Sequence, residues 1–121
     1  MVSADSSHAL YFTNYNLTNS TGTLTSRPVV GGAATVQGSN SFVSLSPRAA
    51  QIVYIDNTML AGNPLAPVRG DLKAIQTTGG GATLIAPQSD LFYVFSSARD
   101  HVIYTLSNNA GVAGLYTVAL P

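Results

Sequence analysis

The sequence predicts an all-β protein, a single compact β-sandwich or jelly-roll-like domain of about 8–10 short antiparallel strands. Strand-length apolar runs rich in β-branched and aromatic residues recur along the chain, separated by Ser, Asn, Asp and Gly clusters. No segment keeps an apolar 3.6-residue period over three turns, and the helix former Glu is absent. A length of 121 residues suits one domain, 1–121, with 1–7 expected to be a flexible N-terminal arm.

The strongest strand signal is a C-terminal β-meander over residues 90–121. Its three apolar runs are 91–95, 101–106 and 112–120, and polar turns separate them. These runs are apolar on both faces in places, whereas a half-solvated sheet alternates more cleanly. We therefore expect the meander to be either the central layer of a sandwich or a sheet whose second face another subunit covers.

The N-terminal third predicts four strands, over 8–17, 23–27, 33–37 and 41–45. Residues 19–22 read as a turn, and Gly38-Ser39-Asn40 reads as a second turn between the third and fourth strands. Pro28 cannot donate a hydrogen bond to a ladder, so the second strand is expected to lie at a sheet edge.

The middle of the chain predicts a corner, a central strand and a long loop. Residues 46–50 suit a corner or one helical turn, because Pro47 follows a Ser cap. The apolar run 51–55 predicts a central strand that ends in a turn at 56–58. Two prolines and two glycines in 59–70 predict an irregular excursion of the chain, that is, a long loop. Loops of this length often make binding contacts.

Two further short strands precede the meander. They are predicted over residues 72–77 and 82–86, with Gly79-Gly80-Gly81 as the hairpin tip between them. The glycine run lacks the Lys-Ser/Thr of a phosphate loop. Pro87 is expected to close the second strand.

Charge is the most unusual feature of the composition. Asp, Glu, Lys and Arg make up 8% of the chain, against about 25% in ordinary domains, and the formal net charge is zero. A basic groove for nucleic acid and a basic membrane-surface helix are therefore not expected. Cysteine is absent, which excludes disulfides and thiolate metal sites, and no cofactor is expected.

Candidate catalytic chemistry is sparse. His8 and His101 are the two imidazoles, and Asp100-His101 with a serine is a conceivable hydrolytic triad. The favoured interpretation is that Arg99-Asp100 closes a hairpin and His101 begins the next strand. No metal-ligand spacing is visible, so no catalytic or metal residue is assigned.

The candidate interaction residues lie in the predicted loops or at the polar strand ends beside them. They are Tyr15, Asn16, Asn63, Pro64, Arg69 and Asp71. Arg69-Gly70-Asp71 resembles an integrin-recognition tripeptide, but three residues are weak grounds, and the favoured interpretation is Arg and Asp flanking a Gly turn.

These features favour a non-enzymatic structural protein that self-associates and docks on a larger particle. A phage or virus virion component, such as a capsid decoration (cement) protein, fits a small, charge-poor chain in which no secretory signal is visible. A trimer is the first guess for its symmetry, and the location would be the virion, or the cytoplasm before assembly. The alternative is a small lectin- or adhesin-like carbohydrate-binding module, and a small hydrolase is a third.

Overall fold

Ten β-strands and no helix make up the regular structure of the described residues, which are 1–3, 6–42, 46–48, 51–62, 66–78, 80–107 and 113–120 of a computed structural model. The all-β prediction is therefore confirmed. The strands are β1 His8–Asn16, β2 Thr21–Pro28, β3 Thr35–Phe42, β4 Ser46–Arg48, β5 Gln51–Ala61, β6 Ala66–Gln76, β7 Thr83–Asp90, β8 Tyr93–Phe95, β9 His101–Leu106 and β10 Gly114–Ala119.

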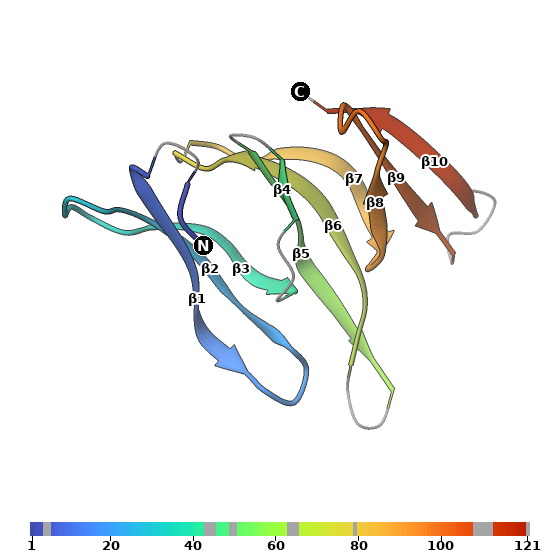
Figure 1. The fold of residues 1–121 in the computed structure, drawn as a ribbon. Helices are drawn as coiled ribbons and strands as arrows, with labels where there is room; N and C mark the ends of the chain where they lie inside the picture. The colour runs from blue at the N-terminus through green and yellow to red at the C-terminus, as the bar shows by residue number, and fades with distance from the viewer. Residues whose placement is uncertain are drawn as a thin grey trace.

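The strands form three antiparallel sheets, with orders β1-β2-β3 (sheet A), β4-β5-β6-β7 (sheet B) and β10-β9-β8 (sheet C). Sheet B is the middle layer (Figure 1). Ile52 and Tyr54 of β5 pack against sheet A, while Val53 and Ile55 of the same strand pack against sheet C. A strand covered on both faces reads as a continuous apolar run, so the predicted central strand is confirmed.

Tyr54 joins sheets A and B with both its ring and its hydroxyl. The side chain is fully buried, and its hydroxyl donates a 2.9 Å hydrogen bond to the carbonyl of Gln37 in β3. Burial, with a smaller contribution from Asp56, raises the pKa of Tyr54 above its ordinary value. The phenol is therefore held neutral as a donor.

Tyr54→Phe is expected to lower the free energy of unfolding by about 1 kcal/mol, because the Gln37 carbonyl loses its donor while the ring still fills its site. Urea unfolding measures the change. Tyr15→Phe is the matched control, because Tyr15 is 48% exposed, and it should change stability by less than about 0.5 kcal/mol. Equal effects in the two variants would contradict the assignment.

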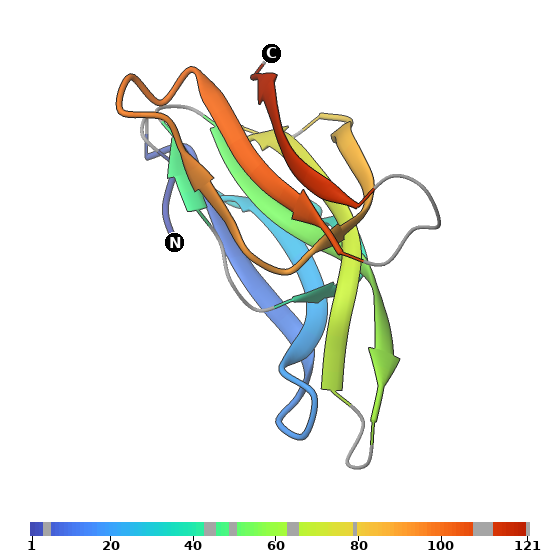
Figure 2. The same cartoon turned by 90° about the vertical axis from the view of Figure 1, so that its right-hand side faces the viewer.

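The C-terminal meander is confirmed, and it lies in an outer layer. The strands β8, β9 and β10 pair consecutively, and sheet C covers only one face of sheet B (Figure 2). Its outer face carries exposed apolar side chains, with Phe92 82% and Leu115 73% exposed. Of the two alternatives expected for the meander, the central layer is therefore wrong.

Two sheet A predictions are wrong. β2 pairs with both β1 and β3, so it is central, and Pro28 only ends its ladder. Residues 38–40 continue β3 and form no turn, because hydrogen bonds hold this segment to β5: Asn40 Nδ2 donates to Thr58 O at 2.8 Å, and Thr58 Oγ1 donates to Asn40 O at 2.9 Å.

The middle of the chain forms more strand than predicted. Residues 46–48 form β4 against β5 and make neither a corner nor a helical turn. The polar residues 56–58 form a bulge within β5, where Asn57 has a φ of +48°. Of the excursion predicted over 59–70, residues 59–61 belong to β5 and residues 66–70 belong to β6, while residues 63–65 lie outside the described residues. Strand β7 runs through Pro87, which an edge strand tolerates.

The glycine run predicted as a hairpin tip lies between β6 and β7. Gly80 has a φ of +106°, a conformation that favours glycine, and Gly79 lies outside the described residues. At the chain start, Val2 bridges to Ala9, and the Met1 ammonium donates to Leu10 O at 2.9 Å. Residues 1–3 therefore lie against β1.

Candidate functional site

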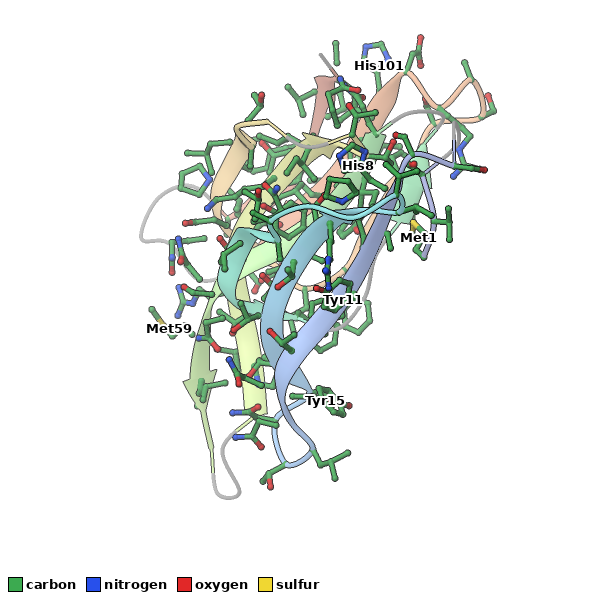
Figure 3. The ribbon with its side chains drawn as sticks, turned by 90° about the vertical axis from the view of Figure 1, so that its left-hand side faces the viewer. Met1, His8, Tyr11, Tyr15, Met59 and His101 are labelled. Atoms are coloured by element: carbon green, nitrogen blue, oxygen red, sulfur yellow. The ribbon has the colours of Figure 1, made fainter. Side chains whose placement is uncertain are left out.

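Two of the predicted interaction residues lie where β1 turns into β2. Tyr15 projects from the end of β1 (Figure 3), and it is half exposed. Asn16 ends the strand, and its Oδ1 accepts a 2.9 Å hydrogen bond from the amide of Thr18. This is the side-chain-to-backbone bond that Asn makes in turns, so Asn16 already has a structural role. Asn63 and Pro64 lie outside the described residues.

The tripeptide Arg69-Gly70-Asp71 lies inside β6, between β5 and β7, so the predicted Gly turn is wrong. The Asp71 carboxylate accepts hydrogen bonds from Asn57 Nδ2 at 2.9 Å and from the Gln88 amide at 3.3 Å. Gly70 is buried within the sheet. An extended, paired strand does not present these three residues as a projecting loop.

The structure brings together a polar cluster that the sequence did not reveal. Asp56 of β5 is 3% exposed, and its Oδ2 lies 2.8 Å from Lys73 Nζ of β6. Its Oδ1 accepts a 2.9 Å hydrogen bond from the fully buried Ser41 hydroxyl of β3. The cluster therefore ties sheets A and B together. Only the isolated position of the sole lysine in an apolar chain could have indicated it.

Burial alone would raise the pKa of Asp56, but hydrogen bonds from Lys73 and Ser41 and the charge of Lys73 outweigh it. The pKa of Asp56 is held below its ordinary value of 3.8. The stability that the ionised carboxylate contributes is therefore present above the unfolded-state pKa, and it is lost as the pH falls through the lower, folded-state pKa.

The free energy of unfolding is expected to fall when the pH drops below about 4, and the Asp56 cluster should account for part of the loss. Urea unfolding at successive pH values measures the slope, and Asp56→Asn should flatten it. Because Asp71 has no comparable burial, Asp71→Asn is the matched control. An unchanged slope in Asp56→Asn would contradict the role of this carboxylate.

Arg99 and Asp100 lie between β8 and β9 and His101 begins β9, as the favoured interpretation predicted. Hydrogen bonds from His101 and then Ser96 lower the pKa of Asp100 to about 2. Ser96 Oγ lies 2.8 Å from Asp100 Oδ1, and His101 Nδ1 lies 2.9 Å from the same oxygen. The carboxylate thus lies between serine and histidine, whereas a hydrolytic triad needs the histidine in the middle.

Two shallow surface hollows are lined by described residues. One, of about 360 Å³, lies on sheet A, and Tyr11, Arg27 and Val29 are among the residues that line it. The other, of about 170 Å³, lies on the outer face of sheet C between Phe92, Val94 and neighbouring side chains, and its lining is almost wholly apolar.

Within the described ranges, no group of three or more His, Asp or Glu side chains is placed to hold a metal ion. Nor does any described segment form a helix long and apolar enough to cross a membrane. Comparison of the chain with protein-family models, with curated proteins and with solved structures finds no significant match.

Proposed function

We propose that the chain is a non-enzymatic structural protein that associates with copies of itself and docks on a larger assembly, such as a virus or phage shell. In such an assembly it would act as a capsid decoration protein, in the virion or, before assembly, in the cytoplasm. The observation that carries the proposal is the character of the surface, which combines very few charges with many exposed apolar side chains.

Fourteen large hydrophobic side chains are exposed in the described part of the chain. They lie on all three sheets and on the segments beside them: Met1, Val2, Tyr11, Tyr15, Leu17, Val29, Val30, Val36, Met59, Val68, Leu84, Phe92, Val94 and Leu115. Single exposed hydrophobic residues are normal, whereas contiguous apolar patches mark surfaces that other proteins cover, and Phe92, Val94 and Leu115 line one such patch on sheet C.

The few charged groups are largely engaged within the chain itself. Lys73 and Asp56 form a buried pair, and the Arg99 guanidinium lies 4.9 Å from the centre of the Phe95 ring. Arg27 Nε donates to the carbonyl of Gly32 at 3.2 Å. Charge on a surface keeps protein molecules apart, so a surface with so little of it favours association.

The native mass of the purified full chain tests the proposal. Light scattering or mass photometry at micromolar concentration is expected to give a multiple of the 12.5 kDa chain mass, with three copies as the first guess. A monomer at that concentration, with no affinity for any protein shell, would end the proposal.

A carbohydrate-binding module is the second candidate, and the hollow on sheet A favours it. Tyr11 offers a partly exposed ring there, and Arg27 offers hydrogen-bond donors beside it, a pairing that suits sugar hydroxyls. A glycan array with the full chain tests this function. Binding that Tyr11→Ala or Tyr15→Ala abolishes would support it, and an array without signal would remove it.

A further inference from the structure

Strands at sheet edges expose unpaired N–H and C=O groups, and proteins usually block them. Five of the six edges in the described sheets carry a blocking feature. The edge strands β4 and β8 are only three residues long. The edge strand β7 contains Pro87, and its pairing with β6 shifts register. The pairing of the edge strand β3 with β2 also shifts register. β1 is bulged near Asn16, and residues 1–3 bond to its other end.

The edge strand β10 has none of these features. Its six residues carry no charge and no proline, and they pair with β9 without any register shift. Figure 1 shows β10 on the outside of sheet C, away from the other sheets. Within the described residues its only sheet neighbour is β9. This strand is therefore a regular, uncharged edge that is open to another strand.

The direction of the free backbone groups follows from one hydrogen bond. The amide of Leu120 donates to Asp100 O at 2.8 Å, so Leu120 faces β9. In an antiparallel ladder, alternate residues bond to the same neighbour. The N–H and C=O groups of Leu115, Thr117 and Ala119 therefore point to the open edge.

A second β10 fits this edge when the two strands run antiparallel about a two-fold axis at Thr117. Thr117 then lies opposite its own copy, a favourable Thr–Thr pair, and Leu115 lies opposite Ala119. On the inner face, Tyr116 lies opposite Val118, which is a favourable aromatic–β-branched pair. No like charges meet, and all three outward-pointing residues of each copy gain backbone partners.

The outer face of sheet C makes this pairing favourable in a second way. Leu115, Phe92 and Val94 are 73%, 82% and 60% exposed on that face or at its rim. Joining two sheets edge to edge places the two apolar faces side by side as one continuous surface. This joined apolar surface would be the face that docks on the shell of the proposed function.

We infer that β10 pairs with β10 of a second copy, so that sheet C continues across two chains as a six-stranded sheet. This inference rests on the proposed self-association and specifies its contact. The contact is isologous and has two-fold symmetry, so it gives an even number of subunits, unlike the threefold order that the sequence suggested.

Charge substitutions at the axis test the contact. Thr117→Lys or Thr117→Asp places two like charges directly opposite each other, so each variant alone should have half the native mass of the wild type. An equimolar mixture of the two should recover the wild-type mass, because opposite charges then meet. Val36→Lys, on the edge strand β3, is the matched control and should keep the wild-type mass, because Val36 is 62% exposed and lies opposite the uncharged Thr25.

Cross-linking provides an independent test, because the chain contains no cysteine. Hydrogen-bonded antiparallel partners have Cα atoms about 5.5 Å apart, which is within disulfide range. Thr117→Cys should therefore form a covalent dimer under mild oxidation, and Leu84→Cys should not.

The outcomes separate the two proposals. A wild-type monomer overturns both self-association and its contact. A wild-type oligomer with an odd number of subunits, or one that Thr117→Lys leaves intact and in which Thr117→Cys does not cross-link, overturns the β10 contact alone.

Discussion

Lys73→Met is expected to lower the free energy of unfolding by about 3 kcal/mol, measured by urea unfolding near neutral pH. The substitution leaves the buried Asp56 carboxylate with only neutral donors, of which Ser41 is the closest side chain. The Lys73 side chain is 20% exposed, so water can reach its position in part, and the expected loss lies at the lower end of the range for broken buried pairs.

Arg69→Met is the matched control for that experiment. Arg69 lies on the same strand, and it is partly exposed near Asp90. Exposed ion pairs contribute little, so this variant should lose less than about 1 kcal/mol. If the two variants were equally stable, the Asp56–Lys73 pair between β5 and β6 would not be a major source of stability within sheet B.

Gly70→Ala is expected to cost about 2–3 kcal/mol, because the added methyl group has no room. A Cβ at this position would lie 2.5 Å from Ile55 Cγ2 and 2.6 Å from the backbone oxygen of Asp56. Both atoms belong to the central strand β5, which sheets A and C cover, so neither can easily move.

Gly81→Ala is the control for this second prediction. No atom lies within 4 Å of a Cβ at Gly81, so the variant should change stability by less than about 0.5 kcal/mol. Urea unfolding compares the two. A Gly70→Ala variant as stable as the control would show that close packing of strands is not the reason for glycine in the Arg-Gly-Asp tripeptide.

The sequence predicted the strands best where apolar runs were long and uniform. The run 51–55 and the three runs of the meander all lie within or around observed strands. Alternation and composition report which residues are buried, and burial on both faces gave the central strand its continuous apolar character.

The sequence misled where turn-forming residues serve tertiary contacts. Gly38 reads as a turn residue, yet it lies in strand β3. Close packing accounts for the glycine, because a Cβ there would come within 2.5 Å of Ser41 Oγ and Asp56 Oδ1. Asn57 likewise reads as a turn residue, and it makes a bulge. Local propensity cannot reveal a contact made by strands that are distant in the chain.

For the candidate sites, too, the sequence indicated local features and missed those that depend on contacts between distant strands. Tyr15, which the sequence predicted as an interaction residue, is exposed. The polar cluster around Asp56 was missed, because its members come from three different strands. The open edge of β10 was also missed, since which strands lie at sheet edges depends on the order of strands in space.

The concentration dependence of amide hydrogen exchange along β10 tests the central claim most directly. In dilute solution, the inward amides of Tyr116, Val118 and Leu120 should be protected, and those of Leu115, Thr117 and Ala119 should exchange fast. At high concentration, the outward amides should become protected as well, because a second β10 binds them. Outward amides that exchange equally fast at every concentration would contradict pairing through β10.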